Sequence, residues 1–78
     1  MIPLYGFVKG DTLGILVVAH PDETVGELAG KLQQAADVRV RRREKIRVLY
    51  KDRSLDLSAT VAQAGFEPLA RFDVEPAP

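Results

Sequence analysis

Residues 24–36 are the one stretch of this chain with the pattern of a long amphipathic helix. Thr24 followed three residues later by Glu27 has the spacing of a capping box, so the helix is expected to begin there. A single helix can bury its apolar face only against another layer, so the rest of the chain must supply a sheet. The apolar positions that recur at helical spacing are Val25, Leu28, Ala29, Leu32, Ala35 and Ala36.

Strand-like segments lie on both sides of this helix. Residues 4–8 and 14–19 are rich in β-branched and aromatic side chains, and the short loop between them contains Gly10, which predicts a hairpin. The order of elements predicts an α+β fold in which one main helix packs across a mixed sheet of four to five strands. Later in the chain, strands are expected at residues 46–51, 55–57 and 71–74, a helical turn ending at glycine at 60–65, and a frayed tail at 75–78.

The length and composition limit the kind of protein this can be. The 78 residues have room for one core, so residues 1–78 are expected to form a single domain. Cysteine is absent, which removes disulfide bonds, thiolate nucleophiles and zinc–thiolate sites. The longest apolar run, residues 15–19, is far shorter than the ~20 residues of a membrane span. No secretory signal pattern is visible, so cytoplasmic residence is expected.

Catalysis and metal binding need converging polar side chains, which this sequence does not offer. His20 is the only histidine and stands beside Pro21, which favours a turn residue over a metal ligand. The two serines have no histidine within plausible reach to act as a base. Gly10 and Gly14 do not precede a helix, as the glycines of a phosphate-binding loop would. We therefore expect no enzymatic activity, no cofactor, no metal and no small-molecule substrate.

The net charge is zero, but the charges are unevenly distributed. Residues 39–53 carry eight Lys and Arg side chains against two acidic ones, which predicts a positive lobe on an otherwise acidic body. The run Arg41, Arg42 and Arg43 has three open interpretations: a solvated loop, a site for an acidic protein partner, or a phosphate-binding site for nucleic acid. The zero net charge and the lack of aromatic residues among the arginines argue against nucleic acid.

The second predicted strand does not alternate between apolar and polar residues. If residues 15, 17 and 19 face the helix, then Leu16 and Val18 point away from it, with nothing in this chain to cover them. We therefore expect an exposed apolar patch rimmed by charge, as at a protein interface, although scattered surface hydrophobes are a possible alternative. The predicted patch consists of Phe7, Leu16, Val18 and Leu49, with Tyr5 on the same outer face.

The order of the predicted elements resembles ubiquitin over nearly the whole chain. The residues that carry this resemblance are Phe7-Val8-Lys9 in the first strand, Pro21 and Thr24 at the helix start, and Leu55-Asp56 in the short fourth strand. The resemblance implies a β-grasp (ubiquitin-like) fold. Ubiquitin and the sulfur-carrier proteins end in a Gly-Gly used for activation, whereas this sequence ends in Ala77-Pro78, so conjugation chemistry is not expected.

A narrower resemblance begins at Val38. The segments that carry it are Arg41-Arg42-Arg43-Glu44, Ile46-Arg47-Val48, residues 60–68 (Thr-Val-Ala-Gln-Ala-Gly-Phe-Glu-Pro) and Phe72-Asp73-Val74. They are similar to the small B (gamma) subunit of toluene 4-monooxygenase-type hydroxylases. The resemblance implies an accessory subunit bound to the larger subunits of a carboxylate-bridged diiron hydroxylase, whose large subunit carries the metals, in aromatic hydrocarbon catabolism.

The leading hypothesis is thus a non-catalytic accessory subunit of a bacterial multicomponent monooxygenase that acts by protein–protein docking. Two alternatives stay open: a free-standing ubiquitin-like adaptor, for example of a bacterial secretion system, and a nucleic-acid-binding domain. The residues expected to bind the partner are Phe7, Leu16, Val18, Leu49, Arg41, Arg42 and Arg43.

Overall fold

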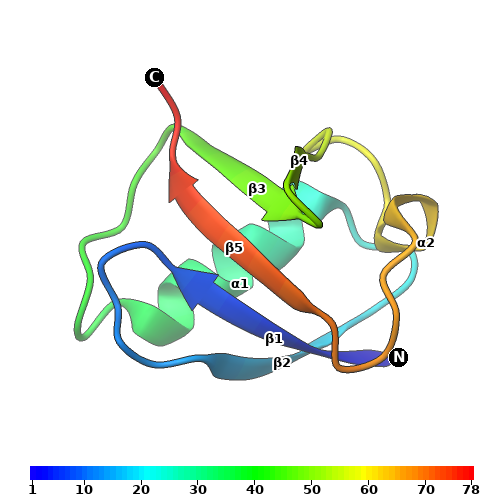
Figure 1. Cartoon of the computed structure of the whole chain (residues 1–78), viewed down its shortest axis with the longest axis horizontal. Helices are drawn as coiled ribbons and strands as arrows, with labels where there is room; N and C mark the ends of the chain where they lie inside the picture. Colours follow the sequence, from blue (N-terminus) through cyan, green and yellow to red (C-terminus); the bar gives the residue numbers. More distant parts are fainter.

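The computed structural model describes residues 1–78, which form one five-stranded sheet and two helices (Figure 1). The strands are β1 (Ile2–Val8), β2 (Ile15–Ala19), β3 (Ile46–Tyr50), β4 (Arg53–Ser54) and β5 (Arg71–Pro76), and the helices are α1 (Val25–Ala36) and α2 (Val61–Ala64). The strand order is β2-β1-β5-β3-β4, with β1 and β5 parallel and the other neighbours antiparallel. Because α1 lies across one face of this mixed sheet, the predicted α+β, β-grasp architecture is confirmed. Neither helix is long and apolar enough to cross a membrane.

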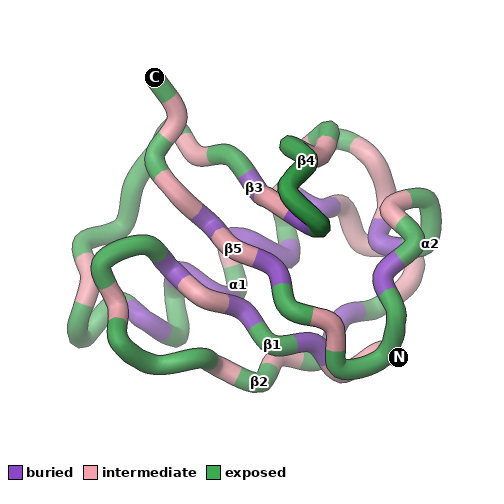
Figure 2. Tube along the Cα trace, viewed as in Figure 1, coloured by how far each residue is buried: buried purple, intermediate pink, exposed green.

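The core lies between α1 and the sheet. Buried and less buried positions alternate along β1, β3 and β5, because successive side chains of a strand point to opposite faces (Figure 2). Gly6 faces α1, and a Cβ atom there would come within 2.7 Å of a Leu32 methyl carbon, so the helix can approach β1 closely only over a glycine. The largest fully buried side chains are Phe72, Leu4, Leu28, Leu32, Val25, Val48, Val61 and Val74.

Both helices begin with a capping box. The hydroxyl of Thr24 accepts a hydrogen bond from the Glu27 N–H at 3.0 Å, and the Glu27 carboxylate accepts one from the Thr24 N–H at 2.9 Å, as predicted. Thr60 and Gln63 repeat the arrangement at α2. The predicted helical turn ends at Gly65, whose φ of 74° is in the left-handed region that glycine adopts readily.

The starts of the two helices are joined by backbone hydrogen bonds. In α1, the N–H groups of Val25 and Gly26 donate to the carbonyls of Ala59 and Leu57 at 2.8 and 2.9 Å. In α2, the first two N–H groups donate in return to the carbonyls of residues 23 and 21. Gly26 is therefore a point of close backbone approach: a Cβ atom there would lie 3.2 Å from the Leu57 carbonyl oxygen.

The short fourth strand was predicted two residues too late. Lys51 and Asp52 both have positive φ, 52° and 63°, and form a two-residue turn, so β4 pairs with β3 immediately at Arg53 and Ser54. The predicted strand at residues 55–57 is instead an irregular segment with two half-buried leucines, which imitate strand alternation.

The predicted frayed tail is also wrong for most of its length. Strand β5 continues through Glu75 and Pro76, which pair with Arg47 and Ile46 of β3. The N–H of Ala77 then donates to the Lys45 carbonyl at 3.0 Å. Proline has no N–H to donate to a neighbouring strand, but the last residue of a strand does not need one, so Pro76 is compatible with this position.

Candidate protein-docking surfaces

The face of the sheet turned away from α1 is uncovered, and β1 and β2 place apolar side chains on it. Leu16, Val18 and Tyr5 are 55%, 48% and 42% exposed, respectively. Tyr5 pairs with Leu16, and Pro3 with Val18, so these four residues are neighbours on one face; we call them the β1–β2 patch. The predicted register of β1 and β2 is confirmed, because Leu16 and Val18 point outward and Ala19 is buried beneath the helix side.

Phe7 lies beside this patch but is half-buried by its own chain. The guanidinium carbon of Arg71 lies 4.0 Å from the centre of the Phe7 ring, close enough for a cation–π contact. On the β2 side, a Cβ atom at Gly14 would come within 2.5 Å of the ring, so the glycine backbone packs directly against it. Arg71 and Gly14 therefore cover part of the Phe7 ring, and the rest is exposed.

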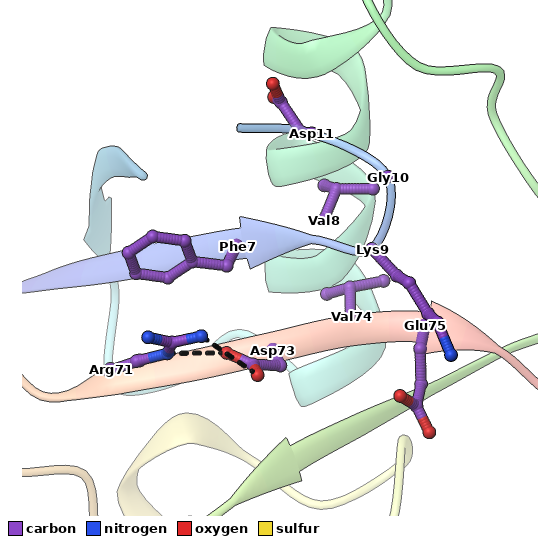
Figure 3. A pocket seen from close by; sticks show the side chains of 9 residues that line it. All are labelled: Phe7, Val8, Lys9, Gly10, Asp11, Arg71, Asp73, Val74 and Glu75. Carbon is purple, nitrogen blue, oxygen red and sulfur yellow. Dashed lines mark hydrogen bonds and ion pairs between the residues drawn. The ribbon is translucent and has the colours of Figure 1, made fainter. Parts of the chain in front are cut away.

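Arg71 is itself held in place by Asp73. Its Nε and Nη2 donate to the two carboxylate oxygens of Asp73 at 3.0 and 3.4 Å, as the dashed lines in Figure 3 show. This hydrogen bonding raises the pKa of Arg71, which stays charged in any case. Figure 3 also shows Phe7 and Arg71 side by side at a shallow hollow that extends along β1 and β5 toward Lys9 and Glu75.

Leu49 is separated from the other predicted patch residues. Strand β5 lies between β1 and β3, and Asp73 is the register partner of both Phe7 and Leu49. The charged side chains of β5 thus divide the outer face into two parts. The prediction of a single continuous patch is therefore wrong. Strand β5 inserts between β1, which carries Phe7, and β3, which carries Leu49.

The basic run lies in the loop between α1 and β3, and Arg41, Arg42 and Arg43 are exposed. Arg39, just before the run, donates from Nε and Nη2 to the Asp11 carboxylate at 3.0 and 2.9 Å. This bond from Arg39 is the main reason that the pKa of Asp11 lies below its usual value.

A buried glutamine holds the same loop against α1. The Gln33 side chain accepts a hydrogen bond from the Arg43 N–H at 2.9 Å and donates to the Arg43 carbonyl at 3.3 Å. Gln33 is the one buried polar residue of the chain, and both of its polar atoms are satisfied. The loop that carries the arginines is therefore fixed at both ends, by Arg39 and by Arg43.

Ion pairing distinguishes the arginines of the basic segment. Arg39 and Arg47 pair with Asp11 and Glu75. Between them, no carboxylate lies within 4.0 Å of the side-chain nitrogens of the three arginines in the basic run. The chain thus presents three unpaired guanidinium groups side by side in sequence.

Sequence reasoning missed several of these residues. Gln33 carried a readable signal, because it follows the buried Ala29 by four residues and so falls on the covered face of α1. The pairing of Asp11 with Arg39 had no local signal, since 28 residues separate the two. The role of Arg71 depends on the placement of β5 beside β1, which no local pattern shows.

The solitary histidine is a turn residue, as predicted. His20 is exposed after β2, and its Nδ1 accepts a hydrogen bond from the Asp22 N–H at 3.2 Å. No group of three or more His, Cys, Asp or Glu side chains is placed to hold a metal ion.

Comparison with known proteins finds one matching family and similar solved structures. Residues 1–75 match the model of a family described as toluene-4-monooxygenase system protein B (TmoB). Among solved structures, a chain of a toluene 4-monooxygenase HD complex with the inhibitor 4-bromobenzoate has a TM-score of 0.89 and 25% identity, covering 97% of this chain and 98% of that one. The ubiquitin of Caldiarchaeum subterraneum, with a TM-score of 0.80, 18% identity and coverage of 99% and 94%, shares the fold. No curated protein matches the sequence significantly.

Proposed function

Since this chain belongs to the toluene-4-monooxygenase system protein B family and is thus a non-catalytic accessory subunit of a monooxygenase, we propose that it acts by docking. In this proposal the outer face of its sheet binds a larger subunit of the hydroxylase. The chain contributes assembly and stability to the complex and takes no part in the oxidation itself.

The exposed β1–β2 patch is the observation that carries this proposal. Apolar side chains on adjacent strands leave a continuous apolar surface in contact with water, and covering such a surface is worth about 25 cal/mol for each Å². Lys31 and Arg71 place positive charges at the edges of this surface, as polar rims do around interface cores.

Arg71 is suited to be an anchor of the interface. It is the register partner of Tyr5, so an arginine and a tyrosine, two residue types enriched at interface hot spots, stand side by side on the outer face. Its guanidinium is already oriented by Phe7 and Asp73 before any partner binds. Less conformational entropy is therefore lost on binding than for a free arginine.

The other predicted partner residues extend the proposal. Leu49, beyond the charged strip of β5, contacts the margin of the same partner, and the run Arg41, Arg42 and Arg43 faces acidic side chains of the complex. The accessory subunit works in the cytoplasm, together with the hydroxylase, in the oxidation of aromatic hydrocarbons.

The docking face can be tested by changing Leu16 or Val18 to Asp and measuring co-purification with the co-expressed hydroxylase subunits. Burying a charge at an interface without a partner is costly, so each variant should bind more weakly by at least about tenfold. The melting temperature of the isolated chain should stay nearly unchanged, because both side chains are exposed in the folded chain.

Val38→Asp is the matched control, since Val38 is an exposed valine in the loop after α1, outside the β1–β2 patch. This variant should co-purify normally. Normal binding by Leu16→Asp and Val18→Asp would exclude the outer face as the docking surface. An equal loss in Val38→Asp would show that any added negative charge weakens binding, so that the two losses would not support this face.

A further inference from the structure

A second surface lies on the opposite side of the molecule from the β1–β2 patch. It is a groove of about 640 Å³ between α1 and the loop that leads to β3. Gly26 and Gly30 form the helix side of this groove, and Arg42, Arg43 and Glu44 form the loop side. Gln33 and the aliphatic side chains of Ile46 and Leu57 complete its lining.

The two arginines are pre-positioned along this groove. Gln33 binds both the N–H and the carbonyl of Arg43, so the loop backbone cannot move away from α1 without breaking two hydrogen bonds. A Cβ atom built on Gly30 would lie 3.8 Å from Nη2 of Arg42, so this guanidinium is near the surface of the helix. The loop backbone that carries both arginines is thus held beside the groove before any ligand arrives.

The charges of the groove lack a partner within the chain. Neither Arg42 nor Arg43 forms an ion pair, in contrast to Arg39 and Arg47 on either side of them. Glu44 is the only acidic residue in the lining and pairs with neither arginine. Arginine forks match carboxylates with two parallel hydrogen bonds, so carboxylates are the natural complement.

We propose that this groove binds an extended acidic segment of a protein partner, with carboxylates paired to Arg42 and Arg43. The lining favours a peptide over nucleic acid, because it offers aliphatic side chains and glycine backbone but no aromatic ring on which a base could stack. Glu44 would moreover repel a continuous phosphate backbone, whereas a peptide can place an uncharged residue beside it.

The groove and the β1–β2 patch can be occupied together. The groove is lined by α1 and the loop that leads to β3, whereas the patch lies on the face of the sheet turned away from α1. The accessory subunit can thereby join two segments of one complex. This inference rests on the proposed docking function and gives the acidic contact of Arg42 and Arg43 a defined site. Leu16 and Val18 of the β1–β2 patch do not line the groove.

A fluorescent hexaglutamate peptide, titrated with the whole chain at low salt, tests the groove. Loss of a charge-assisted hydrogen bond corresponds to about tenfold in affinity, so Arg42→Ser and Arg43→Ser should each bind about tenfold more weakly. Arg41→Ser is the matched control, because it removes the same charge from the same loop but does not line the groove. Glu44→Gln should bind more tightly, since it removes the repelling charge.

Shape is tested separately from charge with Gly30→Gln, which places a long side chain in the groove. The variant should lose peptide binding while its melting temperature is maintained or increased, because glutamine is a better helix former than glycine. Leu16→Asp should bind hexaglutamate normally, so failure of the sheet-face proposal and failure of this one are distinguishable.

Three results would overturn the proposal. One is an equal loss in Arg41→Ser and Arg42→Ser, which would indicate diffuse attraction without a built site. Another is no hexaglutamate binding at low salt. The third is tighter binding of a single-stranded oligothymidylate of the same charge, which would make the basic loop a nucleic-acid site.

Discussion

Asp11 shows at the scale of one residue how distant parts of this chain are joined. Its side chain is only 1% exposed, and the Arg39 guanidinium binds both of its carboxylate oxygens. The hairpin between β1 and β2 is thereby tied to the residues that follow α1. The charged form of Asp11 is favoured, chiefly by the hydrogen bond from Arg39, so its pKa is below the ordinary value of 3.8.

A lowered pKa in the folded state predicts a defined dependence of stability on pH. The contribution of Asp11 is present above its ordinary pKa and is lost as the pH falls through the lower pKa of the folded chain. Asp11→Asn should therefore lower the free energy of unfolding at neutral pH. The same variant should lose less of this free energy than the unchanged chain as the pH drops below about 4. Urea unfolding across this range measures both effects.

Asp37→Asn is the control for this experiment, since Asp37 is exposed and forms no ion pair. It should not lower the free energy of unfolding at neutral pH, because it breaks no ion pair. If the free energy of unfolding of Asp11→Asn runs parallel to that of the unchanged chain at all pH values, the Asp11–Arg39 pair contributes nothing to acid sensitivity.

At the scale of elements, α1 depends on two glycines that have different surroundings. Gly26 faces the Leu57 carbonyl, toward which its own N–H donates, and a Cβ atom there would meet that oxygen at 3.2 Å. At Gly30 the nearest atom to an added Cβ is a flexible arginine terminus at 3.8 Å, an ordinary contact distance. The same substitution should therefore have opposite outcomes one helical turn apart.

Gly30→Ala should stabilise the chain by up to about 1 kcal/mol, the difference in helix propensity between the two residues. For a domain of this size such a gain raises the melting temperature by roughly 4–8 °C. Gly26→Ala should gain nothing or lose stability, because the junction between α1 and the 57–59 segment must shift to admit the methyl group. Equal stabilisation by the two substitutions, measured by thermal unfolding, would contradict the close approach at Gly26.

At the scale of the whole molecule, charge and apolar surface are on different faces. The β1–β2 patch faces away from α1, and the unpaired arginines lie in the loop between α1 and β3. Unpaired exposed charges contribute little to the stability of the fold, but they attract an oppositely charged partner. The range of this attraction becomes shorter as the salt concentration rises. Folding and association should therefore respond differently to removal of the basic run.

Changing Arg41, Arg42 and Arg43 together to Ser should leave the melting temperature nearly unchanged. The rate of association with the hydroxylase should decrease at low salt and lose most of its dependence on ionic strength. Stopped-flow mixing at several salt concentrations measures this rate. Arg39→Ser is the contrasting variant, because it should lower the melting temperature by leaving a covered Asp11 carboxylate unpaired. A triple variant that unfolds would show the run to be structural.

Features set by neighbouring residues could be derived from the sequence alone. The start of α1 at Thr24 depends on hydrogen bonds to a residue three positions away, and the outward direction of Leu16 and Val18 follows from the period of a strand. The helical turn that ends at Gly65 is a local feature of the same kind. The family resemblance, carried by short segments, is likewise a property of the sequence, and the match over residues 1–75 confirms it.

Only the tertiary structure decided which of these features meet. The separation of Leu49 from Phe7, the pairing of Asp11 with Arg39 and the close approach of Gly26 to Leu57 all involve residues 28 or more positions apart. Each depends on the insertion of β5 between β1 and β3 or on the path of the loops around α1. Local periodicity carries no information about such contacts, because they form only when the apolar faces of all the elements are buried in one core.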